Sequence, residues 1–157
     1  MFSLRPSFLI VISLLLAACG QQPATDKAQA ASSAAAVATE AAVEKADLAA
    51  MLATADVKQG ERAFLQCRAC HTLEEGGINK LGPNLFAVFD QPAGQVEGFN
   101  YSEALVASGI SWDIETMDAW IKRPSEVIPR NRMVFVGIRD AQQRANLIAY
   151  LLEQTSK

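Results

Sequence analysis

Two cysteines and the only histidine of this 157-residue chain stand within five positions of one another, as Cys67, Cys70 and His71. The spacing Cys-x-x-Cys-His fits three kinds of site: a structural zinc site, a redox-active dithiol, or an attachment site for c-type haem. Each of these sites needs a different fold around it. The cluster therefore constrains the fold more than any other feature of the sequence.

The ligand count and the surrounding pattern separate the three kinds of site. A tetrahedral structural zinc site needs four ligands; the cluster supplies three, and the remaining cysteine, Cys19, lies far upstream, so zinc would also need a carboxylate. A thioredoxin-like dithiol is expected in a βαβ context, but no alternating strand pattern of useful length occurs. Haem attachment is favoured, with thioether bonds at Cys67 and Cys70 and with His71 as one axial ligand of the iron.

A second axial ligand from this chain cannot be another histidine. The methionines other than the initiator are Met51, Met117 and Met133. Met117 shares helical spacing with neighbouring isoleucines, which favours core packing, and Met51 lies in an Ala-rich segment. Met133 lies in a loop that follows a predicted helix, where its thioether is free to reach the iron. We therefore predict Met133 as the second axial ligand.

The N-terminus predicts export from the cytoplasm. Arg5 precedes an uncharged apolar run over residues 8–18, which is too short to span a bilayer, since a spanning helix takes roughly 20 apolar residues. The run is typical of a signal peptide and ends in LAAC, which resembles the lipobox of bacterial lipoproteins. We predict a signal peptide over residues 1–18 and a lipidated Cys19. An ordinary signal peptide with a chance cysteine and an uncleaved anchor are the alternatives.

The segment after Cys19 differs in composition from the rest of the chain. Residues 20–55 are dominated by Ala and contain no aromatic residue, so the segment cannot bury enough apolar surface to order itself on a core. We predict an Ala-rich flexible tether over residues 19–55, helical in part because Ala is the best helix former. A domain over residues 56–157 follows it.

Helical signals recur through this domain. Asp56 can cap a helix that runs through Cys67 towards His71, a short helix is expected near residues 101–108, and another over about 114–122 should stop before Pro124. Residues 125–139 look extended or looped. Asp140 begins a capping-box pattern, and an apolar stripe of helical period follows it.

The stretch between the first two predicted helices lacks such signals. Residues 74–100 are rich in Gly, Pro and Asn, which predicts loops. The sequence therefore indicates an all-α domain with an irregular middle that is too long to support itself. Something bound in the interior must order it.

Residues 59–153 resemble a class I cytochrome c of the mitochondrial and bacterial soluble type. The resemblance runs through CRACHT, GGINKLGPNLF, GFNYSEA, SGISW, WIKRPSEVIPRNRMVFVGI and RANLIAYL. It implies the cytochrome c fold, in which several short helices and loops wrap around one covalently bound haem c. It also implies one-electron transfer in place of enzymatic catalysis.

The resemblance assigns roles to individual residues. It implies covalent haem attachment at Cys67 and Cys70, axial ligation by His71 and Met133, and a hydrogen bond from His71 Nδ1 to the Pro83 carbonyl, a bond that fixes the orientation of the ring. Tyr101 and Trp112 resemble donors to a haem propionate, Asn131 resembles the polar residue beside the other propionate, and Trp120 stands at the family's aromatic position near the methionine sulfur. A contact between the first and last helices is implied for Gly60, Phe64, Leu147 and Tyr150.

Four positions depart from the family pattern without touching a ligand. Gln91 replaces a common arginine near a propionate, Leu105 replaces a polar residue near the haem, Arg130 replaces a loop glycine, and Asn79 replaces a frequent loop histidine. These departures bear on the reduction potential and on the propionate pKa values. They leave the haem assignment intact.

The predicted function is that of an electron carrier on the periplasmic side of a bacterial membrane, held there by its N-terminal lipid. The predicted partners are redox proteins such as a quinol:cytochrome c oxidoreductase and a terminal oxidase or reductase. The formal net charge of -3 speaks against a nucleic-acid partner. The alternatives are a haem peroxidase and a gas sensor, either of which needs a labile Met133.

One segment of the chain concentrates positive charge despite the negative total. We call it the basic rim, and it comprises Lys122, Arg123, Arg130, Arg132 and Arg139. By the family resemblance it borders the exposed haem edge, where it would steer an acidic redox partner. Long basic side chains that cover apolar surface are the alternative interpretation.

Overall fold

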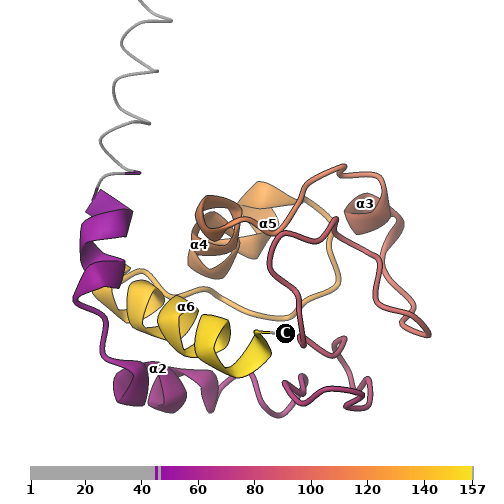
Figure 1. Ribbon diagram of the computed structural model, residues 1–157. Coiled ribbons are helices and arrows are strands. Elements are labelled where there is room, and N and C mark those ends of the chain that lie inside the picture. The colour runs from indigo at the N-terminus through magenta and orange to yellow at the C-terminus, as the bar shows by residue number, and fades with distance from the viewer. Residues whose placement is uncertain (1–44, 46, 157) are drawn as a thin grey trace, which may run out of the picture. The chain divides into compact units, whose positions relative to one another are not determined.

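Helices α2 (Val57–Phe64) and α6 (Ala141–Thr155) pack against each other at the base of the domain (Figure 1). The computed structural model describes residues 45 and 47–156, which belong to one compact unit, Ala38–Lys157. The predicted signal peptide, Cys19 and most of the predicted tether lie outside the described residues. The contact implied by the family resemblance is present, since the Phe64 and Tyr150 rings lie 5.7 Å apart.

The capping signals in the sequence mark where α2 and α6 begin. Asp56 accepts a hydrogen bond from the Gln59 amide at 3.1 Å at the start of α2, and Asp140 accepts one from the Gln143 amide at 2.7 Å at the start of α6. Such side-chain acceptors satisfy amides that have no partner within the helix. The predicted starts of both helices are confirmed.

Helices α3, α4 and α5 lie between these two in the sequence. Helix α3 (Glu103–Val106) is a single turn capped by Ser102, and α4 (Ile114–Lys122) is capped by Asp113. Helix α4 packs against α6 and against α5 (Pro124–Val127). No strand occurs among the described residues; Pro92 and Ser111 form an isolated antiparallel bridge. The all-α prediction is confirmed.

Two predictions about helix extent are wrong. The first helix ends at Phe64 instead of continuing towards His71, because the amides of both Cys67 and Arg68 bond to the Phe64 carbonyl and turns follow. Residues 125–127 are helical, not extended, because Pro124 stands at the first position of α5. Proline suits that position, where its fixed φ is helical and its missing N–H would have had no partner.

The end of the predicted tether is ordered. Residues 47–53 are helical, and Leu48 is buried with 7% of its surface exposed. This segment, which we call the N-terminal helix, accepts a hydrogen bond at its Met51 carbonyl from Gln142 of α6. The Asp56 amide then donates to Asn146 Oδ1 at 2.9 Å. Residues 47–55 therefore pack on the domain, although they fall within the range predicted as tether.

Candidate functional site

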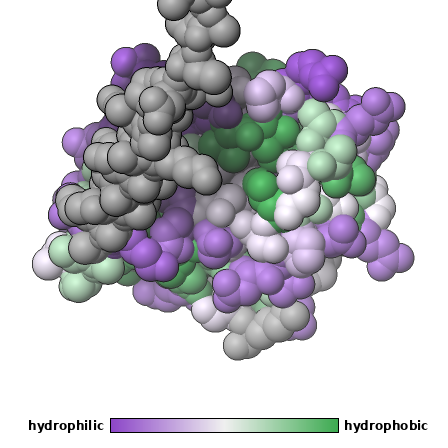
Figure 2. All heavy atoms as spheres, turned by 90° about the horizontal axis from the view of Figure 1, so that it is seen from above, coloured by the Kyte–Doolittle hydropathy of each residue, from purple (hydrophilic) through white to green (hydrophobic). Residues whose placement is uncertain are grey.

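A cavity of about 640 Å³ lies between the helices and the irregular middle of the domain. Its volume falls within the range of about 300–1,000 Å³ that is usual for sites of small molecules and cofactors. Helices α2, α4 and α6 contribute apolar side chains to its wall, and residues 81–101 and 131–135 contribute much of the rest. Figure 2 shows apolar residues gathered around a hollow in this face of the molecule. The irregular middle of the chain thus lines an interior space, where the sequence predicts a bound group.

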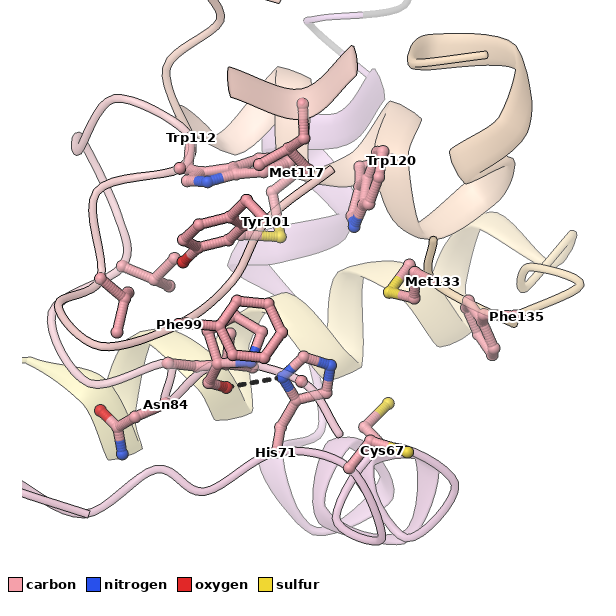
Figure 3. A pocket seen from close by; sticks show the side chains of 18 of the residues that line it. Cys67, His71, Asn84, Phe99, Tyr101, Trp112, Met117, Trp120, Met133 and Phe135 are labelled. Carbon is pink, nitrogen blue, oxygen red and sulfur yellow. Dashed lines mark hydrogen bonds between the residues drawn. The ribbon is translucent and has the colours of Figure 1, made fainter. Parts of the chain in front are cut away.

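His71 faces this cavity with its ring orientation fixed. Its Nδ1 lies 2.8 Å from the Pro83 carbonyl oxygen (Figure 3). Because a carbonyl can only accept, Nδ1 carries the proton and Nε2 keeps its lone pair. Burial lowers the pKa of His71, which also favours the neutral ring. The hydrogen bond implied by the family resemblance is present, and it leaves Nε2 able to bind a metal.

Gly82 allows the loop to approach this ring. A Cβ placed on Gly82 would lie 2.3 Å from His71 Cε1. This distance is far shorter than a normal contact between two carbon atoms, so a residue with a side chain does not fit at this position. The Gly82 amide donates to the Cys70 carbonyl at 2.8 Å. The loop that carries Pro83 is therefore held directly against the cysteine cluster.

Cys67 and Cys70 both line the cavity beside His71. They stand on a turn in which the amides of Cys70 and His71 both bond to the Cys67 carbonyl, at 2.9 and 3.0 Å. This turn brings the three side chains to one side although α2 has already ended. Burial, with a smaller effect of Cys70, raises the pKa of the Cys67 thiol to about 11. Two thiols and a neutral imidazole thus face one interior space.

Met133 reaches the same cavity from the loop between α5 and α6. Its amide donates to Asn131 Oδ1 at 2.9 Å, while Asn131 Nδ2 donates to the carbonyls of Ile128 and Pro124 at 2.8 and 3.1 Å. Figure 3 shows the Met133 thioether turned into the cavity above His71. Asn131 therefore organises the backbone that presents Met133.

The other methionines occupy different places. Met117 is buried on α4, with 6% of its surface exposed, and also lines the cavity. Met51 belongs to the N-terminal helix and is not among the residues of the cavity wall. Two thioethers, those of Met117 and Met133, are thus available to a group bound in the cavity.

The remaining predicted pocket residues also line the cavity; they are Pro83, Tyr101, Trp112, Trp120 and Asn131. The indoles of Trp112 and Trp120 meet edge to face at 5.2 Å, and Tyr101 meets Phe99 edge to face at 4.8 Å. Burial raises the pKa of Tyr101. The structure therefore brings together every predicted site residue that lies within its described part.

Several polar residues that position the site were not predicted from the sequence. Asn84 donates to Thr72 Oγ1 at 2.7 Å and to the Glu74 carbonyl at 3.0 Å, and it accepts from the Phe86 amide, so it ties together the loops that follow His71. Arg144, which is buried, and Asp118, which is half-buried, form an ion pair between α6 and α4. A charged residue inside the apolar stripe of the last helix was the signal for Arg144.

A sequence profile of the Cytochrome c family matches residues 57–155. The chain belongs to the cytochrome c family. The cytochrome c2 of Blastochloris viridis is 42% identical over 107 residues, which cover 66% of this chain and 84% of that protein. The cytochrome c of Stellaria longipes is 41% identical over 101 residues, which cover 64% of this chain and 94% of that protein.

A solved structure agrees with these relatives. Cytochrome cH from Methylobacterium extorquens is 38% identical to this chain, with a TM-score of 0.59 over 62% of this chain and 98% of its own. Family membership confirms the predicted cytochrome c fold and one covalently bound haem c, and it identifies the chain as a haem electron-transfer protein. The cavity, its two thiols and the neutral face of His71 fit that group.

Among the described residues of the cytochrome, no helix has the length and apolar character needed to cross a bilayer.

Proposed function

We propose that this cytochrome shuttles single electrons between membrane redox complexes of a bacterial envelope, through one haem with His71 and Met133 as axial ligands. The meeting of Cys67, Cys70, His71 and Met133 at one cavity carries the proposal. Cys67 and Cys70 would hold the haem by thioether bonds. With His71 and Met133 as its ligands, the haem iron would keep no position for a substrate, which would restrict the chemistry to electron transfer.

The residues around the ligands serve a carrier by preventing rearrangement. The Pro83 carbonyl holds the His71 ring in one orientation, and Asn131 holds the backbone of Met133. A haem supplies reversible one-electron reduction of its iron, and a thioether ligand raises the reduction potential. A site that stays fixed in both oxidation states exchanges electrons with little reorganisation.

Three aromatic residues are proposed to contact the haem itself. Tyr101 and Trp112 would donate hydrogen bonds to a propionate, and Trp120 would pack near the Met133 sulfur. All three line the cavity, and buried Tyr and Trp side chains usually find a hydrogen-bond partner for their polar atom. The side chain of Asn131 already bonds to the Pro124 and Ile128 carbonyls and to the Met133 amide, so we propose that it acts mainly on Met133.

The absorption spectrum of the oxidised protein tests the ligand assignment. An iron–thioether bond gives a weak far-red band, which we expect in the natural protein and expect Met133→Ala to lose. Met117→Ala is the matched control because Met117 lines the same cavity from α4. If Met117→Ala removes the band and Met133→Ala keeps it, the ligand is Met117.

Carbon monoxide separates the carrier from a haem peroxidase or a gas sensor with a labile methionine. The reduced carrier should bind carbon monoxide poorly at neutral pH, because Met133 occupies the sixth position. Rapid and complete binding at neutral pH would contradict the electron-carrier proposal and favour one of the alternatives.

We propose that Cys19 carries lipid and holds the domain on the periplasmic side of the membrane. The anchor would keep the domain at the membrane surface that it shares with its proposed partners, a quinol:cytochrome c oxidoreductase and a terminal oxidase or reductase. Stable anchoring takes more than one acyl chain. Cys19→Ser should release a haem-loaded soluble protein, and an intact mass showing an unmodified chain that begins beyond residue 19 would refute the anchor.

A further inference from the structure

Arg144 is a charged residue in the interior of the domain, with 5% of its surface exposed. Its Nε donates to Asp118 Oδ1 at 2.7 Å and its Nη2 donates to Asp118 Oδ2 at 3.2 Å, so the pair is bidentate. A buried charge is costly unless it is paired and its remaining donors are used. The remaining bonds of the guanidinium therefore show what else it holds.

Those bonds go to the end of the Met133 loop, which we define as residues 128–139. Arg144 Nη1 donates to the Arg139 carbonyl at 2.8 Å and to the Ile138 carbonyl at 3.2 Å. One side chain of α6 thus links the carboxylate of Asp118 on α4 to two consecutive carbonyls of the loop. Arg is suited to this because its donors form a rigid planar fork.

The same end of the loop is also fastened to α4 by its backbone. The Ile138 amide donates to the Ile121 carbonyl at 3.0 Å. Gly137, with φ of +92°, lies so close that an added Cβ would stand 2.0 Å from the Lys122 carbonyl oxygen. By contrast, Val134 and Val136, nearer the middle of the loop, are almost fully exposed. The position of Met133 therefore depends on how the two ends of its loop are held.

We propose that the Arg144–Asp118 pair is a latch that holds the returning arm of the Met133 loop and so sets how readily the Met133 thioether leaves the iron. Arg144 and Asp118 do not line the cavity in the described structure, so they are positioning residues that act through the loop. Without the carboxylate, the guanidinium loses its fixed orientation and its grip on the Ile138 and Arg139 carbonyls weakens. This inference rests on the proposed ligation by Met133.

Imidazole binding to the oxidised, haem-loaded protein measures opening of the loop, because imidazole takes the iron position that Met133 vacates. For Asp118→Asn, which keeps the shape of the side chain and removes its charge, we expect imidazole to bind at least tenfold more tightly than to the natural protein. Asp118→Ala should have a larger effect. Arg144→Lys should also tighten binding, since one ammonium cannot replace the fork.

Glu115→Gln is the matched control. Glu115 also stands on α4 and also forms an ion pair, with Lys45 at 2.8 Å, but in the described structure its side chain makes no hydrogen bond or ion pair to the Met133 loop. The affinity of the Glu115→Gln variant for imidazole should stay within twofold of that of the natural protein. If Asp118 and Arg144 act as one unit, the double variant Asp118→Asn, Arg144→Lys should bind imidazole no more tightly than the stronger single variant, whereas additive effects would contradict a shared latch.

Chemical unfolding separates the latch from a general stabilising role. A residue that only stabilises the fold would lower the denaturant midpoint and leave imidazole affinity without denaturant unchanged, and this result for Asp118→Asn and Arg144→Lys would overturn the proposal. Absence of the far-red band in the natural protein would contradict Met133 ligation, and with it both proposals. A normal band with unchanged imidazole affinity in the variants would overturn the latch alone.

Discussion

Gly60 lies directly against the backbone of Asn146, so that a Cβ on Gly60 would stand 2.1 Å from the Asn146 carbonyl oxygen. The same Cβ would lie 2.7 Å from Tyr150 Cβ. Glycine within a helix is unfavourable by roughly 0.5–1 kcal/mol relative to alanine, so local preference does not explain its presence in α2. The close approach of α2 and α6 does.

Gly60→Ala should therefore destabilise the protein although alanine is the better helix former. The contact atoms belong to a backbone carbonyl and a Cβ, which cannot rotate away, so the two helices must separate. We expect a loss of more than about 2 kcal/mol in the free energy of unfolding, at the upper end of what an overpacked core costs. Denaturant titration of the haem-loaded protein measures it.

Gly76→Ala is the control for this prediction. Gly76 has a φ of +67°, and an added Cβ would meet nothing within 4 Å. The substitution therefore carries the backbone cost alone, about 1–2 kcal/mol. A loss for Gly60→Ala no greater than that for Gly76→Ala would contradict the role of close helix packing.

The burial of Leu48 predicts that the N-terminal helix contributes to stability. Leu48→Ala should lower the free energy of unfolding by about 2 kcal/mol, because most of the side chain is removed from a buried position. Ala49→Ser is the control, since Ala49 is exposed on the same helix and its substitution should cost only about 0.5 kcal/mol. Equal losses for the two variants would show that the N-terminal helix is not docked on the domain in solution.

The starts of α2, α4 and α6 could be predicted because their signals are local. Asp56, Asp113 and Asp140 stand directly before the helices that they cap, and their side chains accept from amides three residues later. The cluster of Cys67, Cys70 and His71 could be recognised for the same reason, since its chemistry is contained in five positions. Such features depend on near neighbours in the chain, which the sequence displays.

The features that were missed depend on partners far away in the sequence. Leu48 belongs to an Ala-rich segment that looks unable to bury itself. It is buried, and Gln142 of α6 donates to the Met51 carbonyl of the N-terminal helix while Asn146 of α6 accepts from the Asp56 amide that follows it. Arg144 interrupts an apolar stripe, and its partner Asp118 lies 26 positions away. Neither pairing leaves a local pattern, so a single sequence could not have indicated them.

The cap of α4 predicts a pH dependence. Asp113 accepts hydrogen bonds from the side chain of Thr116 and from its amide, the latter at 2.7 Å. These bonds hold the pKa of Asp113 below its ordinary value. Because the folded pKa is lower than the unfolded one, the stabilisation is complete above the unfolded pKa of about 3.9 and is lost as pH falls through the folded pKa. Asp113→Ala should cost about 0.5–2 kcal/mol at neutral pH, and the difference should shrink in acid.

Asp113→Asn is the matched variant for this test. Asparagine caps a helix about as well as aspartate but does not titrate. At neutral pH the stability of Asp113→Asn should therefore stay close to that of the natural protein. The difference in stability between Asp113→Asn and Asp113→Ala should not change with pH. A gap between Asp113→Ala and the natural protein that stays constant from neutral pH to below the folded pKa would argue against an ionised cap.

The structure changes which members of the basic rim are useful as probes of docking. Arg123 pairs with Glu126, and Arg132 Nη2 donates to the Asn100 carbonyl at 2.9 Å, so reversing either charge would also break a contact within the fold. Arg130 is exposed and lies in the Met133 loop three positions before the proposed ligand. It is therefore the better probe of whether the rim steers a charged redox partner.

Small charged oxidants test the sign of the field at this edge. Reversal of Arg130 to Glu should slow oxidation of the reduced protein by the hexacyanoferrate(III) anion about threefold or more at low salt, and should speed oxidation by a cationic cobalt(III) phenanthroline complex. Both effects should fade with added salt, because the Debye length falls to about 8 Å at physiological ionic strength. Lys58→Glu, an exposed site on α2, makes the same change in net charge and should alter the two rates far less. Equal effects of the two variants would mean that net charge alone steers the reaction, and rates independent of salt would exclude steering by the basic rim.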